Sequence, residues 1–467
     1  SLLNRRRQEI HGRIFDVLQR IEGTMPSVLA QHAAEAGRLA DAIRYGRIAA
    51  EQALRRPAYA EAIAHLETTL ALIDRQPPSP EVERERKDLL LLSGQAQIAH
   101  FGYAHDTTIN TYAEIERIAR ETGDNELLIE GLYGRWAGNY VPGRNPLALE
   151  IADSICEVSN RVDDSLARAL GHRLRGTVLT MMGRTDEATA ALKETERLYD
   201  PAQHGEQAAR FGQDVGIAGN CYRIGVLTLE GRLDSAASLA RDVVRDLDRV
   251  SHAHTAGYAL GHLAYFLCAA EILPLGEDTA RRTIEISERD RMPLWAALGH
   301  ASQSMAHVHQ GRDQEALPEL KNALKTLKDL DFSVFRPMLL ATYAIALART
   351  GQFSLATAQL GEAQELVEEN DARYSEAEVC RAEGHLLLAQ GNKLSAEASF
   401  VHAIGRARDL GHLSWEMRAA EDLAKLMRES GRAAEGRTML SAIHGRFKEG
   451  HSLPMLQRVA QVIAETV

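Results

Sequence analysis

The sequence has few of the residues that stabilise small secreted domains or β-sheets. Only 4 cysteines occur in 467 residues, and none forms a Cys-x-x-Cys pair. Aromatic residues make up 5% of the chain, and alternating runs of β-branched and polar residues are missing. The scarce cysteines argue against a disulfide framework, and the missing alternation argues against β-strands. The composition therefore predicts an all-α protein with reduced, buried thiols.

The chain also lacks an excess of positive charge and a signal peptide. Its net charge of -11 opposes attraction to nucleic acid or to anionic membranes. The first residues include arginines at positions 5, 6 and 7, and no apolar h-region follows them. The most apolar stretch, residues 255–272, contains two glycines and precedes Pro274, which fits a buried helix of a soluble array better than a membrane span. We expect a cytoplasmic protein that binds neither nucleic acid nor a membrane.

Motifs of common enzymes and metal sites are missing too. The sequence contains no G-x-S-x-G, H-E-x-x-H or G-x-G-x-x-G motif and no phosphate-binding loop. Two histidine pairs occur, at 252 and 254 and at 307 and 309. Side chains two residues apart on a helix diverge, whereas metal ligands on a helix need a spacing of three or four. We therefore predict no catalytic residue, no metal site and no cofactor.

A 40-residue repeat dominates the C-terminal part of the chain. Gly311, Gly351, Gly391 and Gly431 are 40 residues apart, and a small residue follows each glycine five positions later. Glycine permits the left-handed turn that ends a helix, and the small residue allows the next helix to pack closely. Another small residue lies seven positions before each glycine. This pattern is typical of helical hairpins stacked in a solenoid.

Similar turns extend the repeat toward the N-terminus, at glycines 37, 102, 143, 183 and 231. The last two of these glycines, 183 and 231, are 48 residues apart, so we expect an irregular insertion at about 199–212. Another turn is expected near Leu275. The proline-rich residues 76–80 cannot be helical, so they separate an N-terminal helical cap or connector (1–76) from the main array (77–467). We predict an all-α, right-handed, tetratricopeptide-like α-solenoid of about ten helical hairpins.

The first helix of each hairpin in such an array lines a concave groove. Each first helix contains the small residue at which the neighbouring helix packs. The number of residues that separates a side chain from this small residue predicts whether the side chain points inward. The resulting groove is aromatic in the middle of the array and charged at its end, which suits an extended or helical peptide. The alternative is that these residues make ordinary contacts between helices. If the assumed packing position were wrong by one residue, a different set of side chains would point inward. The candidate groove residues are Tyr133, Tyr140, Arg173, His262, Tyr265, Glu378, Arg381, His385, Arg418, Glu421 and Lys425.

Several segments carry a more specific resemblance. They read LYDP at 198–201, FGQDVGIA at 211–218, YSEAE at 374–378 and EMRAAEDLAKL at 416–426, with His204. These segments resemble the C-terminal region of a bacterial signalling family. That family joins a class III adenylate or guanylate cyclase, or another output domain, to a signal-transduction ATPase and then to a tetratricopeptide tail. The resemblance runs in order from about Leu2 to Glu465, and it is weakest at Arg446–Gly450.

The resemblance implies a non-catalytic regulatory or sensing module. Its partner would be a protein segment or the ATPase and cyclase domains of its own chain. Two alternatives stay open: a fragment of a nucleotide cyclase or ATPase whose catalytic domains lie outside these residues, and a free-standing peptide-binding adaptor. The first helix has arginines beside Ile10 and Ile14, and we expect it to be a connector within a longer protein.

Overall fold

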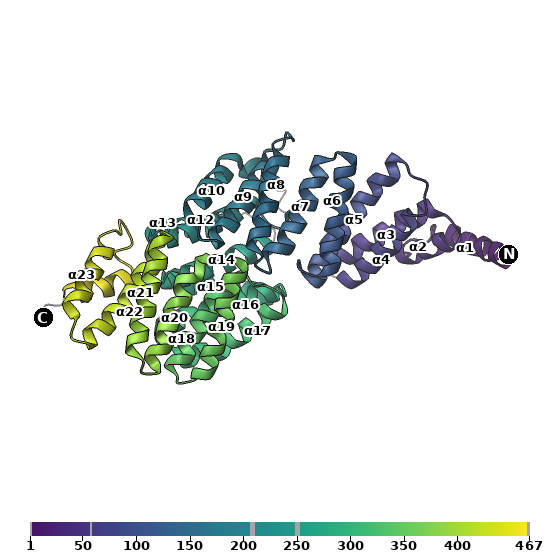
Figure 1. Ribbon diagram of the computed structural model, residues 1–467. Coiled ribbons are helices and arrows are strands. Elements are labelled where there is room, and N and C mark those ends of the chain that lie inside the picture. Colours follow the sequence, from purple (N-terminus) through teal and green to yellow (C-terminus); the bar gives the residue numbers. More distant parts are fainter. Residues whose placement is uncertain (1, 57, 206–210, 248–252, 465–467) are drawn as a thin grey trace. The chain divides into compact units, whose positions relative to one another are not determined.

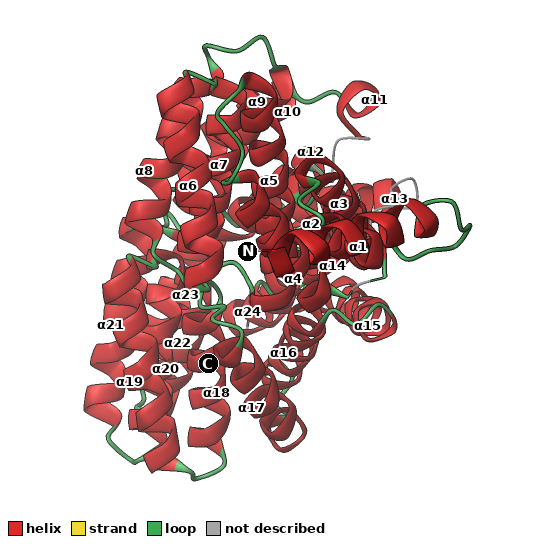
Figure 2. Cartoon of the chain, turned by 90° about the vertical axis from the view of Figure 1, so that its right-hand side faces the viewer, coloured by secondary structure: helices red, strands yellow, loops and turns green. Residues whose placement is uncertain are grey.

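The computed structural model describes residues 2–56, 58–205, 211–247 and 253–464. Within these ranges every regular element is a helix, and loops are confined to the ends of helices (Figure 2). Consecutive helices pack as hairpins (Figure 1), which confirms the predicted all-α, tetratricopeptide-like solenoid. The chain divides into two compact units, Ser1–Gly138 and Asn139–Val467.

The first unit is a row of helices with an alanine-rich core. Phe15, Leu66 and Leu89 are among its fully buried residues. The proline-rich linker joins α4 to α5 inside this unit, and the role of residues 1–76 as a cap stays a prediction. Its helices are α1 (Leu2–Leu18), α2 (Pro26–Glu35), α3 (Leu39–Arg55), α4 (Tyr59–Ile73), α5 (Pro80–Phe101), α6 (Asp106–Thr122) and most of α7 (Asn125–Tyr140).

The second unit contains inner and outer helices in alternation. The predicted insertion holds the short helix α11 (Pro201–His204), and residues 206–210 lie outside the described chain. The inner helices are α9 (Ser165–Met181), α12 (Val215–Leu229), α14 (Ala253–Ala269), α16 (Pro293–His309), α18 (Arg336–Arg349), α20 (Glu376–Ala389) and α22 (Leu413–Glu429). The other helices are α8 (Asn145–Ser159), α10 (Thr185–Leu198), α13 (Leu233–Leu247), α15 (Leu273–Arg289), α17 (Asp313–Asp329), α19 (Phe353–Asn370), α21 (Lys393–Asp409), α23 (Ala433–His444) and α24 (Pro454–Ala464), with the 3-10 turn η2 (Arg373–Ser375) before α20.

Left-handed residues end the helices at a regular spacing. The four glycines of the 40-residue repeat have φ values between 75° and 85°, as the repeat predicts. Glu271 takes the same position one repeat earlier, with φ of 57°, and Gly276 supplies the small residue five positions later. The turn predicted near Leu275 is therefore at Glu271, and the repeat keeps its length there without a glycine.

The small residues of the repeat allow close helix packing. A Cβ atom on Gly384 would lie 2.5 Å from the ring of Phe400, which is on the neighbouring helix α21. Ala316, Ala356 and Ala396, each five residues after a turn glycine, have no exposed surface. These contacts explain why the repeat keeps small residues at fixed offsets.

The apolar stretch at 255–272 belongs to α14, which ends at Ala269, so residues 270–272 form the following turn rather than helix. The helix is buried along almost its whole described length. In the described part of the chain, no helix combines the length and apolar character that crossing a bilayer requires.

The second unit closes on itself. A Cβ atom on the turn glycine Gly143 would lie 3.1 Å from Asn370, and one on Gly183 would lie 3.2 Å from His412. The corresponding atom on Gly231 would lie 2.7 Å from Phe447. Turns of early hairpins therefore contact turns of late hairpins, far along the chain. Glycine is required at these positions by close approach as well as by φ.

Hydrogen bonds join the same regions. The Asn145 side chain donates to the carbonyl of Asn370 over 2.9 Å, and the main-chain N–H of Ser235 donates to Glu449 over 2.8 Å. Contacts between late and early repeats bury much of the inner helices; α18 is buried from Arg336 to Ala348, whereas Lys425 on α22 stays exposed. An all-round buried helix belongs to a core rather than to an open groove.

Candidate functional site

Most of the predicted groove residues lie inside the closed second unit rather than along an open groove. Nine of the eleven are buried, Tyr133 in the first unit and eight in the second. His385 is nearly buried, and Lys425, with 53% of its side chain exposed, lies at the solvent edge. Reasoning from one repeat and its neighbours does not reveal contacts between distant repeats, and these contacts cover the groove. Whether these residues bind a protein segment stays a prediction.

Arg381 on α20 is the first centre of a buried ionic cluster. Its guanidinium contacts the carboxylate of Glu378 at 3.0 Å and that of Asp422 on α22 at 2.7 Å. The Nε2 atom of His385 lies 3.0 Å from the same guanidinium and 2.8 Å from Asp422. These contacts join α20 to α22.

Arg418 on α22 is the second centre, and only 3% of its side chain is exposed. It lies 3.3 Å from Glu378 and 3.6 Å from Glu271, which is in the turn between α14 and α15. Its guanidinium also lies 3.2 Å from Nδ1 of His309 on α16. Arg418 therefore connects three inner helices with the turn at Glu271.

Arg458 on α24 completes the cluster. It contacts Glu271 at 2.8 Å and Glu421 at 3.2 Å, and Lys425 contacts Glu421 at 3.0 Å. The ionic cluster thus contains four cationic side chains and four carboxylates, so its formal charges balance. Its members are Glu271, Glu378, Arg381, Arg418, Glu421, Asp422, Lys425 and Arg458.

Burial sets the protonation of the groups around this cluster. Burial lowers the pKa of His309 well below its ordinary value, and the nearby Arg418 lowers it further. Burial also lowers the pKa of His385, against the opposing effect of Asp422. Although burial opposes ionisation of Asp422, His385 and Arg381 hold the pKa of that carboxyl well below its usual range. His309 is therefore neutral near neutral pH, and Arg381 balances the charge of Asp422.

An aromatic cluster fills the interior beside the ionic one. The ring of Tyr265 stacks on Phe335 with centroids 4.0 Å apart, and Tyr374 meets Trp415 edge-on at 6.0 Å. The guanidinium of Arg418 lies over the Trp415 ring, 5.4 Å from its centroid, so this cation–π contact joins the two clusters. An aromatic-poor chain thus gathers many of its rings at one place.

His262 lies at the centre of the aromatic rings. Its ring stacks on Tyr258 at 4.0 Å, its Nδ1 lies 2.8 Å from the carbonyl of Tyr258, and its Nε2 lies 3.0 Å from the hydroxyl of Tyr222. A neutral ring satisfies both contacts, with Nδ1–H donating and Nε2 accepting. Burial lowers the pKa of His262 to about 3. Arg173 is also buried, and its positive charge lowers the pKa of His262 further; the side-chain oxygen of Gln213 accepts a hydrogen bond from Arg173.

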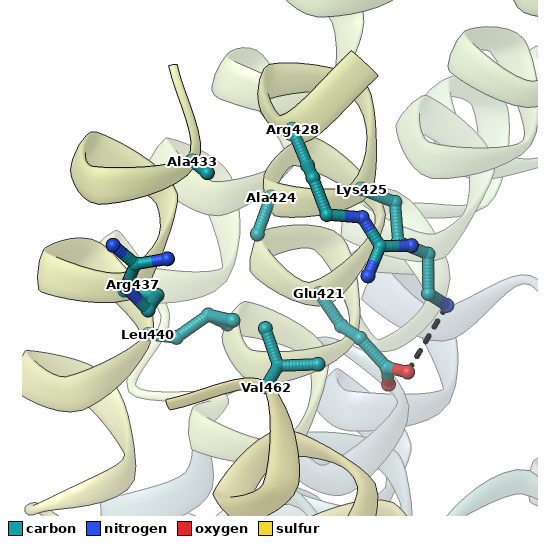
Figure 3. A pocket seen from close by; sticks show the side chains of 8 residues that line it. All are labelled: Glu421, Ala424, Lys425, Arg428, Ala433, Arg437, Leu440 and Val462. Carbon is teal, nitrogen blue, oxygen red and sulfur yellow. Dashed lines mark ion pairs between the residues drawn. The ribbon is translucent and has the colours of Figure 1, made fainter. Parts of the chain in front are cut away.

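A pocket adjoins the ionic cluster where α22, α23 and α24 meet (Figure 3). Glu421 and Lys425 form one wall, and Figure 3 shows the ion pair between them. Arg428 on α22 extends toward the cavity, Arg437 on α23 lines it, and Leu440 and Val462 provide apolar surface. The pocket thus combines cationic and apolar side chains at the solvent edge of the cluster.

Sequence reasoning missed four residues of this site, for different reasons. Glu271 occupies a turn position that glycine usually takes. A glutamate at this position of the repeat could have indicated a functional side chain. Asp422 is next to the predicted Glu421, but the counting scheme did not select its position. His309 and Arg458 join the site only because distant repeats meet, and no local pattern marks them.

The described residues contain no group of three or more histidine, cysteine or acidic side chains placed to hold a metal ion. His307 and His309 are on one helix and diverge as expected, because only His309 reaches Arg418. His252, from the other predicted pair, lies outside the described residues.

Comparison with known proteins gives distant similarities. No family model matches the sequence. The uncharacterized protein R02095 of Rhizobium meliloti (strain 1021) is 22% identical over 435 residues, which cover 91% of this chain. The same match covers 42% of that protein, so the chain spans less than half the length of this curated relative.

Two solved helical structures are also similar. A Rap protein complexed with competence and sporulation factor is 12% identical, with a TM-score of 0.41 and coverage of 90% of this chain and 99% of that one. The Cut9–Hcn1 hetero-tetramer of the APC/C is 12% identical, with a TM-score of 0.43 and coverage of 98% and 92%. At these scores the similarity carries no inference about function.

Proposed function

We propose that this chain is a regulatory protein-interaction module and that its second unit alternates between the closed form and an open form that binds a protein segment. The observation that carries this proposal is the ionic cluster. It joins Glu271 to Arg418 and Arg458, residues that neighbouring-repeat contacts alone would leave apart. Opening the unit would expose the predicted groove residues of this unit to a partner.

Physical chemistry favours a switch at this cluster over a purely structural role. Removing ions from water is costly, and apolar residues of similar size often stabilise a core as well or better. When the closed form opens, the charged side chains regain water, which offsets part of the energy lost with their contacts. A solenoid needs only contacts between neighbouring repeats to stay folded, so opening leaves the hairpins intact.

A partner could stabilise the open form by binding the exposed inner face. Its affinity for the open form would have to exceed its affinity for the closed form, because only a difference shifts the equilibrium. A segment with both acidic and apolar side chains would fit, since Arg418 and Arg458 lose the carboxylate of Glu271 on opening and the aromatic rings become accessible. We infer that this segment belongs to another protein or to ATPase or cyclase domains outside these residues. The match covers 42% of the R02095 protein, so in that relative the segment could come from the part of the protein outside the match.

The test compares the affinity of a partner for free and locked protein. The whole chain would capture proteins from its native cell, and the interacting segment would be identified and synthesised as a peptide. Ser235→Cys and Glu449→Cys, joined by a short bismaleimide, would lock the closed form, in a background where the half-buried Cys156 and Cys380 are alanine.

We expect locking to reduce peptide affinity more than about tenfold. The same double-cysteine protein before crosslinking is the matched control, and it should bind like the wild type. Equal affinity of the locked and unlocked proteins would show that partners bind elsewhere and that opening is not needed.

A further inference from the structure

The first helix, α1, carries an exposed apolar stripe. Ile10, Ile14 and Val17 are 51%, 36% and 60% exposed, and Ile21 continues the stripe in the turn that follows. The spacing of these four residues is 4, 3 and 4, which places them at alternate d and a positions of a heptad. Such a seam normally faces another helix.

The neighbouring face of α1 is already occupied. Phe15 is buried against the first unit, with its ring edge-on to Tyr45 at 5.8 Å. The Arg38 guanidinium lies 5.2 Å from the Phe15 ring centre and pairs with Asp16 at 2.6 Å. The helix is therefore held in place by the face that contains Phe15, and the apolar stripe on the neighbouring face stays exposed.

A row of arginines flanks the stripe. Arg6 and Arg13 share the g position of this heptad register, and Arg20, seven residues after Arg13, lies in the turn that follows α1. All three are exposed, and among the described residues none of them forms an ion pair. By contrast, Arg5 and Arg7, at other positions of the heptad, pair with Glu9 and Glu35.

We propose that α1 docks an amphipathic helix of a partner protein whose apolar seam is flanked by carboxylates. The four stripe residues would form the seam, and the three arginines would pair with glutamate or aspartate at the facing flank positions. Flanking charges of this kind set the partner and the orientation of paired helices. This surface belongs to the first unit and is independent of the ionic cluster in the second.

A second copy of the chain fits this surface poorly. In an antiparallel pair related by a two-fold axis, g positions face g positions, so the three arginines would meet three arginines. In a parallel pair g faces e, where this helix has Asn4, His11 and Leu18 and no acidic residue. Like charges at such close positions destabilise a helix pair.

Charge also argues against a membrane as the occupant. The polar surface of α1 includes the carboxylates of Glu9 and Asp16, and the whole chain has a net charge of -11. Helices that lie on anionic membranes have a polar face rich in lysine and arginine, whereas on α1 Glu9 and Asp16 offset part of the charge of the arginines. Charge complementarity therefore selects an acidic protein helix.

The test uses a designed four-heptad peptide with leucine at a and d and glutamate at e and g, labelled for fluorescence anisotropy. We expect it to bind the full chain, and Arg6→Glu, Arg13→Glu and Arg20→Glu together should weaken binding about tenfold or more. A peptide with lysine in place of glutamate should bind the triple-glutamate variant more tightly than it binds the wild type. Val17→Ser should weaken binding of both peptides, and Leu394→Ser, at an exposed position on α21, is the matched control.

Three outcomes would overturn the proposal, with circular dichroism confirming that each variant is folded. The first is that the wild-type chain binds the acidic and basic peptides equally well, or binds neither peptide. Another is binding of phosphatidylcholine–phosphatidylserine vesicles that depends on the arginines while the acidic peptide does not bind. The last is sedimentation that shows self-association abolished by Val17→Ser, which would make a second copy the occupant.

Discussion

Arg418 donates a hydrogen bond to the main-chain carbonyl of Ala269, which lies 149 residues earlier in the chain. Two residues after that carbonyl, Glu271 supplies a carboxylate to the same guanidinium. Solenoid repeats usually contact only their neighbours, and such contacts leave a concave face open. In the second unit, contacts between distant repeats close that face and place charged side chains in the interior.

Replacing Arg418 by methionine should destabilise the second unit. The Arg418→Met side chain fills similar space but leaves Glu271 and Glu378 short of a cationic partner in a buried place, which should cost about 3 kcal/mol. Urea unfolding would measure the change. The exposed pair of Lys393 and Glu429 provides the control, since Lys393→Met should cost less than about 0.5 kcal/mol. Equal effects of the two substitutions would mean that the ionic cluster adds nothing to stability.

Stability should fall as the pH decreases below about 6.5, partly because of His262. Its folded-state pKa of about 3 is lower than that of the unfolded chain, so acid protonates the unfolded state first. The contribution of His262 is complete above about pH 6.5 and should have fallen by about 2 kcal/mol at pH 5. Unfolding free energies of the wild type and of His262→Gln would be compared at pH 7 and 5. The variant should lose less on acidification, and an identical loss would contradict this assignment.

Two glycine-to-alanine substitutions should have opposite effects. Gly384→Ala places a Cβ atom 2.5 Å from the Phe400 ring and should cost about 1–3 kcal/mol by overpacking. Gly405 is inside helix α21, and a Cβ atom there would meet no neighbouring element within 4 Å, so Gly405→Ala should stabilise the protein by about 0.5–1 kcal/mol. Thermal unfolding checks both signs. A neutral Gly384→Ala would mean that α20 and α21 pack less closely than described.

Left-handed turn positions give a second pair of opposite effects. Arg291 is exposed and has φ of 55°, so Arg291→Gly should raise stability by about 1 kcal/mol by relieving the backbone. Gly391 has φ of 85° and open space beside it, so Gly391→Ala should lower stability by a similar amount. A change of the melting temperature in the same direction for both substitutions would mean that one of these two residues does not have a left-handed backbone.

The fold could be predicted because its signals are local. A glycine at Gly351 and a small residue at Ala356 determine a turn and a close helix contact within six residues of sequence. The turn at Glu271 was harder to predict, because its left-handed backbone comes from the surrounding hairpin and not from a glycine. The prediction missed it by a few residues for that reason.

The candidate site could be predicted only in part. Arg381 and Arg418 lie on inner helices, where the repeat register placed them, and they are buried. The register did not show that Arg458 and His309 would meet them, because those contacts depend on how far the superhelix curves. Curvature is the sum of small rotations at every repeat, and no single motif encodes it.

Closure of the second unit is tested most directly by crosslinking Ser235→Cys to Glu449→Cys with a short bismaleimide. In the native structure the Ser235 hydroxyl lies 3.0 Å from the Glu449 carboxylate, so the two cysteines should link rapidly and within one molecule. Adding Arg418→Met should slow the reaction, because the open form would be more populated. Absence of the intramolecular link in the otherwise native chain would contradict the closed form, and an unchanged rate in the Arg418→Met background would contradict the role of the ionic cluster in closing it.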